Sequence, residues 1–97
     1  MQGVGGSQLV TADLAVGTSG KPIRVLSIHI LSGGTGGVVK LRLGTAVTDT
    51  IWVQETGTAN TGATFTYGKY GFLFSSGCFC DIDANVTSCL VEYWKEA

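Results

Sequence analysis

A chain of 97 residues is long enough for one domain with a single core, and only 13% of its residues are charged, against roughly 25% in an average soluble domain. The formal net charge is −1 and the six lysines and arginines stand singly, which excludes the basic stripe that nucleic-acid binding requires. No apolar run reaches the ~20 residues of a transmembrane helix, and abundant glycine and threonine favour short strands, so we expect an all-β domain with no nucleic-acid or membrane partner.

The chain begins with a glycine-rich segment that offers little to bury. Residues 1–8, MQGVGGSQ, contain three glycines and lack the positive and apolar regions of a signal peptide. We therefore expect no secretion, a flexible arm at residues 1–8 and a single β-sandwich domain over residues 9–97. The first strand is predicted at Leu9–Val16, before the turn cluster of residues 17–20.

The segment Ile23–Leu31, IRVLSIHIL, alternates as a half-buried strand does. One of its faces carries only aliphatic residues and is assigned to the core, whereas the other face includes polar residues. The inner set is Leu26, Ile28 and Ile30, and the outer set is Val25, Ser27 and His29.

The clearest half-buried strand is Val38–Leu43, which follows a glycine-rich turn. Its expected inner residues are Val39, Leu41 and Leu43, and its expected outer residues include Lys40 and Arg42. The next strand is predicted at Ile51–Gln54, with Ile51 and Val53 on one face and Trp52 and Gln54 on the other. A surface loop at residues 56–62 and short strands at Ala63–Tyr67 and Phe72–Phe74 follow.

The C-terminal segment contains all three cysteines of the chain. Its apolar runs, Cys78–Ile82 and Val86–Trp94, flank a turn-forming cluster and predict an antiparallel hairpin. A two-residue turn would place Cys80 opposite Cys89, within reach of a disulfide, whereas a three-residue turn would place Phe79 there. Three cysteines at this spacing are too few for a structural zinc site, so we interpret them as small, buried, reduced thiols.

These segments add up to about eight strands at roughly 8–12-residue spacing, which is typical of a sandwich or barrel. No segment has helical periodicity over the length that a helix needs. We therefore expect an all-β fold of short antiparallel strands in a jelly-roll-like β-sandwich, preceded by the flexible arm.

No motif predicts an enzyme, a metal site or a cofactor. Oxygen-bearing side chains occupy positions one, three, five and twelve of a calcium-loop pattern, namely Asp81, Asp83, Asn85 and Glu92. Val86 stands where that loop needs glycine, so a hairpin turn capped by side chains is the favoured interpretation and a weak calcium site is the alternative. His29 is the single histidine, and no nucleophile motif places a serine beside it. We expect no catalytic residue and no cofactor.

Apolar residues on the outer strand faces predict a partner-binding surface. Such residues are typical interface anchors when they are aromatic and stand on a domain poor in charge. The alternative is that the second sheet covers them. The candidate partner-binding residues are Val25, Val38, Trp52, Phe79, Leu90 and Trp94.

The glycine- and threonine-rich short strands, the N-terminal segment and the closing DANVTSCLVEYW resemble small β-sandwich virion proteins of tailed phages, most closely the capsid cement, or decoration, proteins. The resemblance covers the chain from Leu9 onward. It implies a non-enzymatic structural protein, a homotrimer, that binds the major capsid protein and reinforces the shell. The resemblance further implies a place on the capsid exterior, after assembly in the host cytoplasm.

A small carbohydrate-binding or receptor-binding module is the alternative function. It requires two aromatic rings on one exposed face with polar neighbours, because sugar rings stack on aromatic side chains. The candidate stacking residues are Trp52, Trp94, Tyr67 and Tyr70, with Lys69 and Asn60 as polar neighbours.

Overall fold

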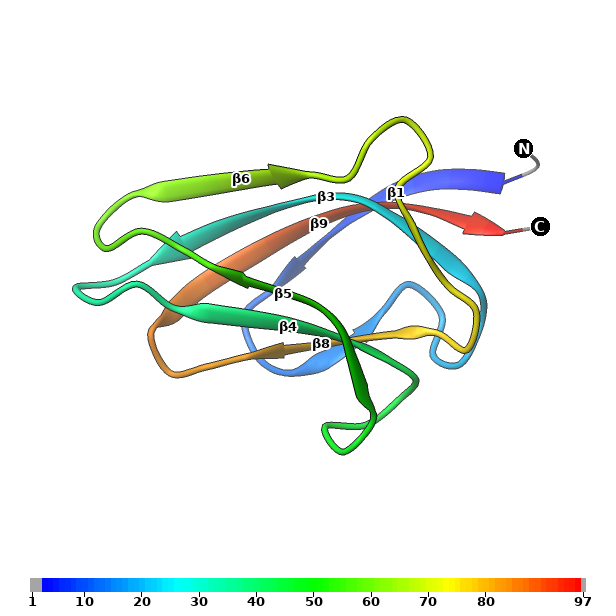
Figure 1. The fold of residues 1–97 in the computed structure, drawn as a ribbon, viewed down its shortest axis with the longest axis horizontal. Helices are drawn as coiled ribbons and strands as arrows, with labels where there is room; N and C mark the ends of the chain where they lie inside the picture. The colour runs from blue at the N-terminus through cyan, green and yellow to red at the C-terminus, as the bar shows by residue number, and fades with distance from the viewer. Residues whose placement is uncertain (1–2, 97) are drawn as a thin grey trace.

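The computed structural model describes residues 3–96, which form nine strands (Figure 1). No described residue is helical, which confirms the all-β expectation. The strands are β1 (Gly3–Val10), β2 (Leu14–Val16), β3 (Ile23–Ser32), β4 (Val38–Leu43), β5 (Thr50–Thr56), β6 (Gly62–Thr66), β7 (Phe72–Phe74), β8 (Cys78–Ile82) and β9 (Val86–Glu96).

The strands form two antiparallel sheets that pack face to face. Sheet A has the order β1-β9-β3-β6, with β7 also paired to β3, and sheet B has the order β2-β8-β4-β5. The pairs β1–β9, β2–β8, β3–β6 and β4–β5 make the chain one long antiparallel ribbon, whose successive pairs alternate between the sheets. A ribbon rolled in this way is a jelly roll, as the sequence predicts. The start of β1 and the end of β9 therefore lie side by side (Figure 1).

The core lies between the two sheets and consists of small and medium-sized aliphatic side chains, one phenylalanine and the three cysteines. Each buried valine or isoleucine contributes about 1.5–3 kcal/mol relative to exposure, which makes this layer the main source of stability. The buried apolar residues are Val10, Val16, Ile23, Val25, Ile28, Ile30, Val39, Leu41, Phe74, Cys78, Cys80, Val86, Cys89 and Val91.

The N-terminal segment is a strand, which corrects the expectation of an arm outside the core. Backbone pairing with β9 runs from Gly3–Glu96 to Val10–Cys89, and residues 1 and 2 lie outside the described residues. Gly5 and Gly6 face Trp94 and Tyr93, and a Cβ on Gly6 would lie 3.0 Å from the Tyr93 ring. The aromatic rings of β9 thus cover the space above the β1 glycines, a local arrangement that stabilises glycine-rich strands.

The predicted strand at Leu9–Val16 is two strands in different sheets. β1 ends at Val10 in sheet A, and β2 begins at Leu14 in sheet B. Asp13 lies in the connection, and its Oδ1 accepts a hydrogen bond from the backbone N–H of Ile82, 2.9 Å away. This bond helps to hold the crossing against β8.

A β-bulge at Leu26 reverses the predicted alternation in the part of β3 that precedes it, and leaves it unchanged after it. Val25 pairs with Tyr93 and Ser27 pairs with the preceding Glu92, which leaves Leu26 as the extra residue. The carbonyl of Leu26 accepts a hydrogen bond from the N–H of Tyr67. Ile28 and Ile30 are inward as expected, but Val25 is fully buried, so its assignment to the outer face is wrong.

The predicted hairpin of Cys78–Ile82 and Val86–Trp94 is instead a connection between the two sheets, because β8 pairs in sheet B and β9 in sheet A. Neither hairpin register therefore applies. The three cysteines are free and buried, which confirms their interpretation as buried thiols. Cys80 and Cys89 meet across the interior of the sandwich, where a hydrogen bond between their thiols and burial raise the pKa of Cys80.

Candidate interaction surfaces

Two leucines lie next to each other on the outer face of sheet A. Leu9 on β1 is directly opposite Leu90 on β9, and their exposed fractions are 59% and 37%. Paired residues of antiparallel strands project on the same face, so these side chains are contiguous. Leu31 on β3 is 41% exposed and stands two residues from His29, which pairs with Leu90. We call Leu9, Leu31 and Leu90 the leucine cluster.

His29 forms the polar border of the leucine cluster. Its Nδ1 lies 2.6 Å from Oγ1 of Thr64 on β6, and a Cβ on Gly62 would lie 2.6 Å from its Nε2. The ring is thus held against the glycine, and its bonded partner is a threonine rather than the carboxylate of a catalytic triad. This geometry fits a structural histidine at the edge of a surface patch.

Trp94 lies on the same outer face but is only half-exposed. It pairs with Gly5 on β1 and with Arg24 on β3, and its indole lies above Gly5. Part of its surface is therefore used within the sheet, where it compensates for the missing side chain of the glycine.

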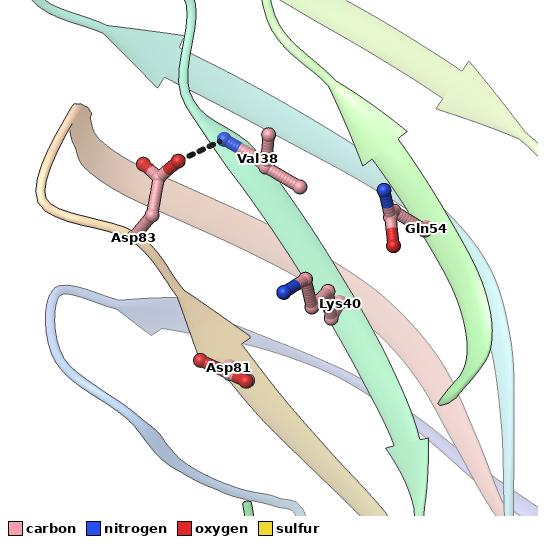
Figure 2. A pocket seen from close by; sticks show the side chains of 5 residues that line it. All are labelled: Val38, Lys40, Gln54, Asp81 and Asp83. Atoms are coloured by element: carbon pink, nitrogen blue, oxygen red, sulfur yellow. Dashed lines mark hydrogen bonds between the residues drawn. The ribbon is translucent and has the colours of Figure 1, made fainter. Parts of the chain in front are cut away.

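The outer face of sheet B contains a shallow hollow of about 210 Å³, below the ~300–1,000 Å³ of typical ligand pockets. Figure 2 shows its lining residues: Lys40 of β4 at the centre, Gln54 of β5 on one side, and two aspartates on the other. Lys40 pairs directly with Gln54 and with Asp81 in the register of the sheet. The full lining is Val38, Lys40, Gln54, Asp81 and Asp83.

Both aspartates of the hollow are engaged within the protein. Nε and Nη2 of Arg42 lie 3.0 and 2.9 Å from Oδ2 of Asp81. Asp83 accepts hydrogen bonds from the N–H of Val38, at 3.0 Å (Figure 2), and from the N–H of Asn85, at 2.9 Å. The described residues contain no group of three or more His, Cys, Asp or Glu arranged to hold a metal ion. Side-chain capping of this turn is as predicted, although the turn joins two sheets and is not a hairpin.

Trp52 stands at a β-bulge in the edge strand β5. Leu41 pairs with Val53 and Arg42 pairs with Ile51, so Trp52 is the extra residue. Ile51 is 41% exposed and Trp52 is 54% exposed, whereas Val53 packs against the core. The expectation that Ile51 shares the inner face with Val53 is therefore wrong, because the bulge shifts the alternation by one residue.

The six predicted partner-binding residues do not form one surface. Val25 is in the core, so the alternative, that the second sheet covers these residues, holds for it. Leu90 and Trp94 lie on the outer face of sheet A. The other three, Val38, Trp52 and Phe79, stand on sheet B, where Val38 and Phe79 are half-buried.

Sequence reasoning missed Leu9 and Leu31 as parts of the exposed surface. The exposure of Leu9 could be predicted from the alternation of residues 7–10, because an inward Val10 places Leu9 outward. The outward position of Leu31 also follows from alternation, because Leu31 stands two residues after His29 on the expected outer face. Its place beside Leu90 depends on the pairing of His29 with Leu90, which the sequence does not contain.

Within residues 3–96 no helix has the length and apolar character that crossing a membrane requires. Comparisons with known proteins found no matching family model, no matching curated protein and no matching solved structure.

Proposed function

We propose that this protein is a structural virion protein that associates with itself and binds a phage capsid shell as a decoration protein. The single observation that carries the proposal is the leucine cluster on the outer face of sheet A. Three exposed leucines lie together on one sheet face that no described element covers, and contiguous exposed apolar residues mark interaction sites.

The energetics of the leucine cluster favour burial against a partner. Each leucine is already partly covered, so its complete burial would contribute on the order of 1 kcal/mol before the entropic costs of association are subtracted. A decoration protein needs affinity from a small footprint, and adjacent apolar anchors supply it.

The jelly-roll fold is compatible with the proposed function but also with carbohydrate binding. Jelly rolls occur in viral capsid proteins and also in lectin domains. Fold therefore does not separate the two candidate functions, and the site must do so. Three copies is the number that the resemblance to decoration proteins implies.

The test begins with purified virus particles from the source of this chain, in which mass spectrometry should find the protein in an amount comparable to the major capsid protein. Shells that lack the protein are then incubated with wild-type protein, Leu90→Ser or Trp52→Ser, and sedimented. We expect wild type and Trp52→Ser to sediment with shells and Leu90→Ser to be lost from the pellet.

Trp52→Ser is the matched control, because it removes an exposed apolar side chain from the opposite sheet. Loss of binding by Trp52→Ser with retention by Leu90→Ser would move the docking surface to sheet B. A wild-type protein absent from virus particles and unable to bind shells would contradict the proposed function itself.

Carbohydrate binding is the second candidate, favoured by one observation: exposed Trp52 lies on the same sheet face as the polar hollow. The other proposed stacking residues fit less well. Trp94 is on the opposite sheet, and Tyr67 packs against Phe72 while its hydroxyl donates to Glu55. A change in Trp52 fluorescence on addition of oligosaccharides, absent in Trp52→Ser, would support this function over shell binding.

A further inference from the structure

Each sheet of the sandwich has two edges, and an exposed edge is a template for pairing with another chain. The edge strands of sheet A are β1 and, on the other side of β3, β6 with β7. The edge strands of sheet B are β2 and β5. Stable proteins protect such edges by shortness, bulges, charge or proline.

Three of these edges carry such protection. β2 has only three residues, and the edge formed by β6 and β7 is divided between strands of five and three residues. β5 is longer but contains the bulge at Trp52 and the charged Glu55.

β1 has none of these four protective features. It has eight residues, GVGGSQLV, without charge or proline, and its register with β9 has no bulge. Its described residues Gly5, Gly6, Ser7 and Leu9 are exposed. No other described strand pairs with its outer edge.

We propose that the outer edge of β1 pairs antiparallel with β1 of a second copy of this chain. The joined sheet would have the order β6-β3-β9-β1 followed by its symmetric repeat. An antiparallel strand pair is self-complementary about a twofold axis, so the same backbone groups bond in both directions. An uncharged strand is suited to this contact, since like charges would otherwise face each other across the axis.

The occupant is a second copy because the edge complements itself and requires nothing from another protein. With the twofold axis at Ser7, residues 4–10 of the two copies pair and span roughly 24 Å, at ~3.4 Å per residue. The twofold axis is perpendicular to the joined sheet, so both leucine clusters lie on the same side of it. A pair would thus present two docking patches to one shell surface, which raises its avidity.

This inference rests on the self-association part of the proposed function and names its contact. A twofold contact closes on two copies. It therefore predicts a dimer in place of the trimer that the resemblance implies.

The test uses Ser7→Lys with Thr66→Lys as its matched control. Both positions are exposed and belong to one row across sheet A, in which Ser7 pairs with Glu92, Glu92 with Ser27, and Ser27 with Thr66. Lysine at position 7 can pair with Glu92 in its own copy, so the fold is retained, while two lysines approach each other across the axis. Lysine at position 66 adds the same charge to the opposite edge.

Light scattering after size exclusion should give twice the mass of one chain for wild type and for Thr66→Lys, and dimerisation of Ser7→Lys should be weaker by at least about tenfold. Hydrogen exchange of wild type provides a second measurement: amides of residues 3–10 should become more protected as concentration increases, with no such change in β6.

A wild-type monomer up to about 500 µM, a trimer, or a Ser7→Lys variant that dimerises as well as wild type would overturn the inference. A monomer that still binds shells would overturn the β1 contact and leave shell binding intact. A dimer that binds no shell would support the β1 contact and contradict shell binding.

Discussion

At the scale of residues, the β-bulges at Leu26 and Trp52 mark where alternation in the sequence stops predicting which side chains are buried. The inward positions of Val39 and Leu41 follow from simple alternation in β4 and are confirmed. In Ile23–Leu31 both alternating sets contain aliphatic residues, so periodicity alone does not reveal that Leu26 is an extra residue. Which residue of β3 becomes the bulge depends on its simultaneous pairing with β9, β6 and β7.

Val25 and Val38 provide a residue-scale test of this difference. Both were expected on the outer face, but Val25 is fully buried and Val38 lines the open hollow. Val25→Ala should lower the free energy of unfolding by about 1–3 kcal/mol because it leaves a cavity, whereas Val38→Ala should cost less than about 1 kcal/mol. Urea unfolding of both variants measures this, and equal losses would contradict the bulge.

For the candidate surface, the exposure of single residues was predictable, but their placement on the two sheets was not. Leu90 and Trp52 are exposed apolar residues, as expected. Their separation onto opposite sheets was not predictable, because it depends on which strand pairs with which.

At the scale of elements, strand positions were predictable and strand partners were not. β8 and β7 occur where β-branched and aromatic runs predict them. A polar turn between two strands is equally compatible with a hairpin and with a crossing between sheets, so residues 83–85 carry no signal that distinguishes the two. The partners of β8 and β9 are set by the rolled ribbon as a whole. The glycine-rich segment before Leu9 forms a strand for the same reason: β9 supplies the rings that its glycines lack.

The connection from β6 to β7 depends on two glycines with different surroundings. Gly68 and Gly71 both have positive φ, at 77° and 64°. A Cβ on Gly68 would meet nothing within 4 Å, whereas a Cβ on Gly71 would overlap the carbonyl oxygen of Val25.

Alanine at these positions should therefore have unequal effects. Gly68→Ala should cost about 1–2 kcal/mol, the strain of a left-handed alanine. Gly71→Ala should cost more, because β7 must also move away from β3. Thermal unfolding of both variants tests this, and a Gly71→Ala variant as stable as Gly68→Ala would show that β7 is not held closely against β3.

At the scale of the whole molecule, the interior of the sandwich contains groups that resist ionisation. Burial between the sheets, with a smaller effect of nearby Cys89, raises the pKa of Cys78 from 9.0 to about 12. Burial and the hydrogen bond to Glu55 raise the pKa of Tyr67 above its usual value of 10.0. That bond, at 3.0 Å, joins β5 of sheet B to the end of β6 in sheet A.

These groups predict a loss of stability in alkali. Above pH 9 the unfolded chain releases thiol protons that the folded chain retains, so the contribution of Cys78 is complete below pH 9 and decreases between pH 9 and about 12. At about pH 10.5 the loss from Cys78 should be about 2 kcal/mol. Urea unfolding at neutral pH and at about pH 10.5 measures it. Cys78→Ala should show a smaller decrease, and an identical decrease would mean that other groups cause it.

The rolled ribbon also determines the order in which sheet A can be completed. β9 lies between β1 and β3, yet it is synthesised after both of them. Until β9 leaves the ribosome, β1 lacks its only described partner and β3 lacks one of its neighbours. Pairing over such sequence distances closes large loops and is slow, typically on the order of milliseconds to seconds. Newly made chains should therefore expose unpaired strands throughout synthesis, and the insertion of β9 should be the step that commits them to the native state.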